Sequence, residues 1–93
     1  MADIRTQSEV WFSGMVQGVG CRYETLKVAK GYEVTGFVEN LTDGRVHLVA
    51  EGSSSEVAGF IAAVTETLSD YIRETEQRSA PYSNQFESFV IRR

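Results

Sequence analysis

Cysteine, histidine and proline are scarce in this sequence, which has one of each among its 93 residues. A single cysteine cannot form an intramolecular disulfide bond, and it cannot supply the two or more thiolates of a cysteine-based zinc site. A single histidine excludes HExxH and every other metal site that needs two histidines. The chain therefore has to fold through its hydrophobic core, without a disulfide or zinc–thiolate cross-link.

Excess positive charge and long apolar runs are also missing. Nine Lys and Arg residues against 13 Asp and Glu residues give a net charge of −4 at pH 7, so the basic surface that long nucleic acids require is absent. The longest apolar run, 60–64, is far shorter than the roughly 20 residues that cross a bilayer. The first ten residues are polar and acidic, unlike a signal peptide. We therefore expect a cytoplasmic protein with no nucleic-acid or membrane partner.

The remaining composition is that of an ordinary globular domain, with 42% hydrophobic and 24% charged residues. A chain of this length forms one domain and buries roughly 60–70% of the surface that it exposes when unfolded. Residues 1–8 are polar, and we expect them to be a disordered N-terminal segment. The folded domain is predicted to cover residues 9–93.

The hydrophobic pattern predicts alternating strands and helices. Helices are expected at 21–30 and 56–68, where apolar residues recur at spacings of three and four. Main strands are expected at 9–15, 32–40, 45–51 and 86–91, with a small extra strand at 71–76 and a loop at 78–84. Asp43-Gly44 marks a hairpin turn between the second and third of these main strands. The order β-α-β-β-α-β predicts a ferredoxin-like α+β sandwich: an antiparallel sheet with two helices on one face.

A glycine-rich segment between the first strand and the first helix is the first candidate site. It contains Gly14, Gly18 and Gly20, and Arg22 follows in the first turn of the helix. Backbone N–H groups in such a loop, the helix N-terminus and an arginine can together bind a phosphate-like anion. The glycines are equally compatible with a purely structural turn. A Walker loop is excluded because the chain has no GK[ST] sequence.

Other residues with chemical potential have a plainer interpretation. Cys21 lies at a helix N-terminus, where a thiolate can be favoured, but a small buried core residue is the preferred reading. Asn40 stands where a strand enters the hairpin turn, a position at which asparagine often caps the turn locally. His47 is expected on the surface. Three acids are expected to form a solvated rim: Glu39, Asp43 and Glu51.

Two segments resemble the signatures of the acylphosphatase family. Residues 14–23, GMVQGVGCRY, resemble G-x-V-Q-G-V-x-F-R, and residues 36–46, GFVENLTDGRV, resemble G-[FYW]-V-x-N-x-x-D-G-x-V. The ending FVIRR is similar to the usual F-x-I-R-Y. The resemblance runs from Val10 to the end and includes the ferredoxin-like fold. The sequence departs from the family pattern at Cys21, where Phe is usual, and at Arg93, where Tyr is usual. The connection near Ser69 is also short.

The resemblance implies an enzyme that hydrolyses the carboxyl-phosphate bond of small-molecule acyl phosphates, without a metal or other cofactor. Arg22 matches the arginine that binds the phosphoryl group, and Asn40 matches the asparagine that orients the attacking water. The remaining matches form a backbone cradle for phosphate: Met15, Val16, Gln17, Gly18, Val19, Gly20 and Cys21. We expect a monomer. The competing interpretation is a non-catalytic anion- or RNA-binding module, since RNA-recognition domains share this strand order.

Overall fold

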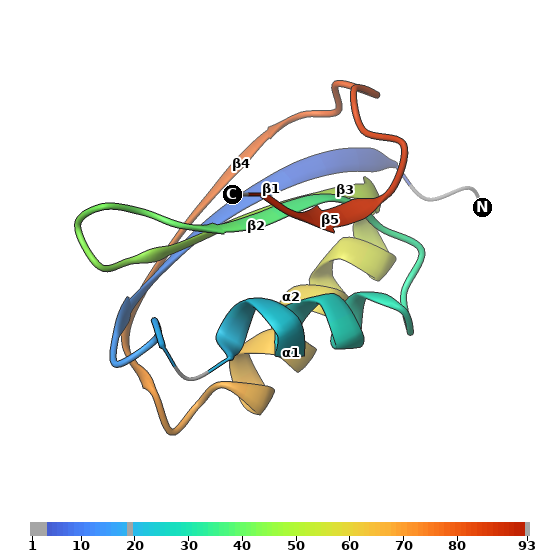
Figure 1. The fold of residues 1–93 in the computed structure, drawn as a ribbon. Coiled ribbons are helices and arrows are strands. Elements are labelled where there is room, and N and C mark those ends of the chain that lie inside the picture. Colours follow the sequence, from blue (N-terminus) through green and yellow to red (C-terminus); the bar gives the residue numbers. More distant parts are fainter. Residues whose placement is uncertain (1–3, 19, 93) are drawn as a thin grey trace.

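The computed structural model describes residues 4–18 and 20–92. Its elements are β1 (Arg5–Gly14), α1 (Cys21–Ala29), β2 (Thr35–Asn40), β3 (Val46–Ser53), α2 (Ser54–Thr67), β4 (Ile72–Pro81) and β5 (Phe89–Ile91). The five strands form one sheet in the order β4-β1-β3-β2-β5, and both helices lie on the same face of it (Figure 1). The ferredoxin-like α+β fold predicted from the sequence is confirmed. Four strands are antiparallel, and β5 adds one parallel pairing to β2.

The core lies between the sheet and the helices. Alternate residues of β3, the central strand, and of its neighbour β1 are fully buried, among them Val10, Phe12, Val46 and Leu48. The stripe predicted for the second helix meets them, with its own set of buried residues: Val57, Phe60, Ile61 and Val64. Burial of such side chains stabilises the fold by about 1.5–3 kcal/mol each. No helix in the described part of the chain is long and apolar enough to cross a membrane.

The first strand is longer than predicted. β1 begins at Arg5, and residues 5–8 pair with β3 on one side, while 6–8 also pair with β4 on the other. The expected disorder of residues 1–8 is therefore wrong for 5–8, and residues 1–3 lie outside the described part. Residues 5–8 are polar and show no alternation of apolar residues, so the hydrophobic pattern did not reveal that they belong to β1. Backbone hydrogen bonds to neighbouring strands stabilise it instead.

The sequence predicted a small strand after α2 and a main strand at the end of the chain, and the structure shows the opposite lengths. The segment after α2 forms the ten-residue strand β4, which includes part of the predicted loop at 78–84, and β5 is the small strand at the opposite edge. Residues 73–79 of β4 are all exposed. An exposed edge strand has no periodic apolar signal, and Pro81, at its last position, is compatible with an edge. The prediction of a small strand at 71–76 was wrong in its length.

The face of the sheet away from the helices carries a buried carboxylate. Glu51 is only 1% exposed, and it accepts hydrogen bonds from Gln7 Nε2 (2.8 Å), Ser83 N (2.7 Å), Ser83 Oγ (2.6 Å) and Asn84 N (3.1 Å). Burial opposes ionisation, but these donors outweigh it and hold the pKa of Glu51 below its usual value. The expectation that Glu51 belongs to a solvated rim is therefore wrong.

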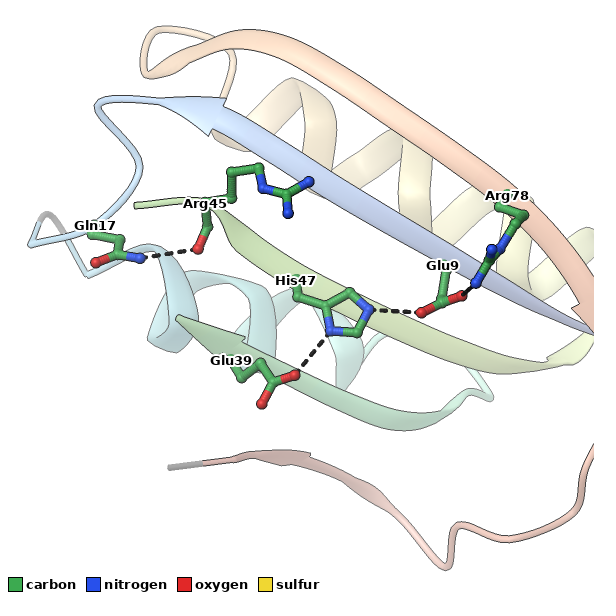
Figure 2. A network of polar contacts seen from close by, with 6 residues as sticks. All are labelled: Glu9, Gln17, Glu39, Arg45, His47 and Arg78. Atoms are coloured by element: carbon green, nitrogen blue, oxygen red, sulfur yellow. Dashed lines mark hydrogen bonds and ion pairs between the residues drawn. The ribbon is translucent and has the colours of Figure 1, made fainter. Parts of the chain in front are cut away.

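His47 lies on the same outer face, between two carboxylates. Its Nδ1 lies 2.9 Å from Glu39 Oε2, and its Nε2 lies 2.9 Å from Glu9 Oε2, as Figure 2 shows. Arg78 Nη2 donates to the other oxygen of Glu9 at 2.6 Å. The imidazole ring also stacks on Trp11, with ring centroids 5.1 Å apart. His47 and Glu39 are thus half-buried parts of a network that crosses four strands, and not freely solvated groups.

Candidate active site

A pocket of about 230 Å³ opens where the β1–α1 loop meets the end of β2. Its lining combines the loop, the first turn of α1 and the last residue of β2: Val16, Gly18, Gly20, Cys21, Arg22, Tyr23 and Asn40. Arg22 and Asn40 come from different elements, and the fold brings both to one hollow. Arg22 and Asn40, the two residues that the sequence singled out, therefore line the same pocket.

Two glycines give the loop its course. Gly18 has a φ of 80° and Gly20 a φ of 78°, both in the left-handed region. A Cβ at either position would meet no heavy atom of the described residues within 4 Å, so the requirement for glycine is conformational and not spatial. Gly20 is also the N-cap residue of α1. The glycines thus permit the sharp turn that carries the chain from β1 into the helix beside the pocket.

The start of α1 provides positive potential at the pocket. The N-cap residue Gly20 has no side chain with which to cap the helix, and residues of the first turn line the pocket, so the positive end of the helix dipole lies beside it. Arg22 lies in that turn and is half-buried. Within residues 4–18 and 20–92, neither Arg22 nor Asn40 makes a side-chain hydrogen bond or ion pair. A planar guanidinium beside a helix N-terminus is suited to an anion with several oxygens, such as phosphate.

Asn40 ends β2, where its Cα lies opposite Val46 of β3. The hairpin that follows is closed by backbone bonds between Leu41 and Arg45 (2.8 Å) and between Gly44 and Leu41 (3.2 Å). Asp43 caps the turn, because its carboxylate accepts from Arg45 N (3.0 Å) and Arg45 Nε (2.8 Å). The backbone bond from Arg45, together with its side chain, lowers the pKa of Asp43. Within the described residues the turn therefore does not use the Asn40 amide as its cap.

The predicted cradle residues do not all reach the pocket. Val16, Gly18, Gly20 and Cys21 line it, and Val19 lies outside the described residues. Met15 lies beside a separate hollow with Tyr71 and Arg73, and its N–H donates to Tyr71 O at 2.9 Å. The Met15 amide is thus already used within the fold. Gln17 contacts the hairpin through its side chain, as described below.

Cys21 is a core residue. Its side chain is 3% exposed and belongs to the main hydrophobic cluster. Burial, and secondarily the carboxylate of Glu24, raise the pKa of the thiol. The protonated thiol is therefore favoured at neutral pH, and a thiolate nucleophile is disfavoured. The preferred interpretation of Cys21 as a buried core residue agrees with the structure.

Two features of the site escaped the sequence analysis. Tyr23 forms part of the pocket wall and is 57% exposed; its position directly after Arg22, in the first helical turn, could have indicated this. The Gln17 side chain donates through Nε2 to Leu41 O (2.8 Å) and to Arg45 O (2.9 Å), and Figure 2 shows the second contact. No local pattern predicts this link, because its partners are backbone atoms far along the chain.

The chemical groups of the pocket are those of an anion site. The lining residues supply one guanidinium, one carboxamide, one phenol and backbone amides, and among them there is no Asp, Glu or His. Among the described residues, no three His, Cys, Asp or Glu side chains are grouped so that they could hold a metal ion. The arrangement can therefore bind an anion and orient a water molecule, but its lining offers no carboxylate or imidazole as a general base.

Comparison with known proteins places the chain in a family. The sequence model of the acylphosphatase family matches residues 8–91. An acylphosphatase of Archaeoglobus fulgidus is 40% identical over 85 residues, which are 89% of this chain and 93% of the relative. The crystal structure of an acylphosphatase from Bacillus subtilis superposes with a TM-score of 0.84 at 27% identity, covering 95% of this chain and 99% of that one. An acylphosphatase structure from Coxiella burnetii has a TM-score of 0.77 at 30% identity, covering 95% and 93% of the two chains.

Proposed function

The chain belongs to the acylphosphatase family, and on that basis we propose how its pocket hydrolyses the carboxyl-phosphate bond of acyl phosphates. The products are a carboxylate and inorganic phosphate. The observation that carries the proposal is the convergence of Arg22, the α1 N-terminus and Asn40 on one hollow. The alternative of a non-catalytic anion- or RNA-binding module is not favoured, because the relatives that match most of the chain are acylphosphatases.

Arg22 binds the phosphoryl group in this proposal. Its guanidinium can donate two parallel hydrogen bonds to phosphoryl oxygens, and the described residues offer it no competing carboxylate. The backbone amides of the loop and of the first turn of α1 add further donors. Phosphoryl transfer depends mainly on positioning and on stabilising the charge of the equatorial oxygens, which is what these groups supply.

Asn40 orients the attacking water. A carboxamide does not take up a proton usefully at neutral pH, but its oxygen can accept a hydrogen bond from water and hold it in line with the scissile bond. The water oxygen attacks phosphorus as the bond to the acyl oxygen breaks, and that electron pair leaves with the carboxylate. A carboxylate is a good leaving group, so no acid is needed to protonate it. The proton of the water passes to a phosphoryl oxygen of the substrate, since no Asp, Glu or His lines the pocket.

A monomeric state and a cytoplasmic location complete the proposal. Both halves of the site come from one chain, the loop and α1 on one side and β2 on the other, which supports a monomer that is active by itself. Light scattering of the eluting protein would measure the mass, and a stable dimer that is alone active would contradict the monomer. Fractionation of the source cells would test the location.

The test of the proposed function is an assay with benzoyl phosphate in the presence of EDTA. We expect the wild-type protein to hydrolyse it, and Arg22→Ala to lose most of this activity. Arg73→Ala is the matched control, because Arg73 is an exposed arginine of β4 that does not line the pocket. Absence of hydrolysis by folded wild-type protein would refute the enzymatic function. Activity that needs added Mg²⁺ would refute only its independence of metal.

A further inference from the structure

Gln17 joins the two halves of the site. It lies in the β1–α1 loop between Val16 and Gly18, yet its side chain reaches across to the β2–β3 hairpin. There Nε2 donates to Leu41 O at 2.8 Å and to Arg45 O at 2.9 Å, and the side chain is partly buried. Figure 2 shows the amide pointing away from the loop and toward Arg45. A single side chain thus ties the loop before Arg22 to the turn after Asn40.

The two acceptors are the carbonyls at the end of the hairpin ladder. Leu41 directly follows Asn40, and its own N–H donates to Arg45 O at 2.8 Å, which closes the ladder. A carbonyl oxygen can only accept, so the amide nitrogen of Gln17, with its two hydrogens, must be the atom that faces both. The link therefore fixes the orientation of the amide and holds the backbone directly after Asn40.

We propose that Gln17 is a positioning residue, whose two hydrogen bonds set the place of Asn40 relative to the phosphate-binding loop. The inference rests on the proposed function, in which Arg22 and the loop bind the phosphoryl group and Asn40 holds the water. An in-line attack requires both halves in register, and a displacement of about 1 Å can lower the rate by roughly 10²-fold. Gln17 does not line the pocket, so it acts on the water through Asn40.

This role predicts a specific division between kinetic constants. Gln17→Met keeps the length of the side chain and removes both donors. We expect its kcat for benzoyl phosphate to fall by roughly 10–100-fold, because the water is no longer held in line. The inhibition constant of inorganic phosphate reports on the loop and Arg22 alone. We expect it to change by less than about threefold, which is a smaller effect than the loss of one charge-assisted hydrogen bond to phosphate.

A second variant adds a signature that general destabilisation would not produce. Gln17→Glu keeps the shape, but its carboxylate turns an oxygen toward two carbonyl oxygens and repels them. Once protonated, the same carboxyl group can donate one hydrogen bond to a carbonyl. We therefore expect the kcat of Gln17→Glu, divided by that of wild type, to rise as the pH falls below about 5. The same ratio for Gln17→Met should not change with pH.

Gln7→Met is the matched control. Gln7 Nε2 also donates one side-chain hydrogen bond of 2.8 Å between distant segments, to Glu51 at another part of the sheet. Gln7→Met removes a hydrogen bond as long as the one from Gln17 to Leu41 O, but away from the site. It should weaken the fold and leave kcat within about twofold of wild type. Circular dichroism and thermal melting show that each variant is folded.

The outcomes separate this inference from the proposed function. A lower kcat with unchanged phosphate inhibition in Gln17→Met, and acid recovery in Gln17→Glu, would support the positioning role. Full kcat in folded Gln17→Met, or phosphate inhibition that weakens in step with kcat, would overturn it while leaving the enzyme function intact. If Gln17→Met does not fold, the pH dependence of Gln17→Glu decides alone. An inactive wild type would overturn the proposed function, and the role of Gln17 with it.

Discussion

Inorganic phosphate should bind the pocket and stabilise the folded chain, and Arg22→Ala should remove most of that stabilisation. The Arg22 guanidinium makes no hydrogen bond or ion pair with the described residues, so phosphate can bind it without breaking such a contact. Two charge-assisted hydrogen bonds are worth about 1.5–3 kcal/mol each. Their loss corresponds to a dissociation constant weaker by roughly 10²–10⁴-fold.

The effect is large enough for a thermal-shift measurement. A ligand at tenfold excess over its dissociation constant, bound only by the folded state, adds about 1.4 kcal/mol to the free energy of unfolding. For a chain of this size, that raises Tm by roughly 6–11 °C. The shift should saturate with phosphate concentration in the wild-type protein. It should also saturate in Asn40→Ala, because Asn40 is assigned to the water and not to the phosphate.

The controls separate binding from a general salt effect. Phosphate is excluded from protein surfaces and raises Tm without a site, but that rise does not saturate. Arg22→Ala should show only this gradual rise, and Arg73→Ala, at an exposed position outside the pocket, should keep the saturable shift. Each titration is repeated at constant ionic strength. Equal saturable shifts in wild type and Arg22→Ala would refute the assignment of Arg22 to the phosphate.

Four further predictions concern Asn40, Cys21 and Glu51. Asn40→Ala should lower kcat for benzoyl phosphate far more than it raises KM; steady-state kinetics measure both, and a raised KM at constant kcat would instead make Asn40 a substrate-binding residue. Cys21→Ser should keep kcat within about tenfold, since the mechanism has no protein nucleophile, and a trapped phosphocysteine would contradict this. Cys21→Phe, at a site only 3% exposed, should cost about 1–3 kcal/mol of stability through overpacking; denaturant unfolding measures it, and a more stable variant would reveal unfilled space. Glu51→Gln should destabilise the fold at pH 7 by about 2 kcal/mol or more, because it weakens charge-assisted bonds from Gln7, Ser83 and Asn84. The pKa of Glu51 is lowered in the folded chain, so this stabilisation of the fold is present at pH values above the unfolded pKa, near 4.5. It is lost as the pH falls through the folded pKa. A wild-type protein that is still more stable than Glu51→Gln by the same amount at pH 2 would contradict this.

Local sequence information was sufficient for the helices, the hairpin and the conformation of the loop. The three- and four-residue spacing in α2, the Asp-Gly turn and the glycines before Cys21 each depend on interactions within a few residues. The order of these elements then determined the ferredoxin-like fold, because few topologies satisfy it. The placement of Arg22 in the first helical turn, and of Asn40 at the end of a strand, followed from the same patterns.

Only the tertiary structure decided which groups form hydrogen bonds with residues far along the chain. Residues 5–8 and 73–79 form strands without an apolar pattern, because hydrogen bonds to β1, β3 and β4 stabilise them, and such bonds leave no trace in side-chain order. Glu51 is buried because a segment more than 30 residues later folds over it and supplies its donors. Gln17 bridges the loop and the hairpin through carbonyl groups, which every residue has. The sequence therefore determined which residues could form the site, and long-range packing decided how they are held together.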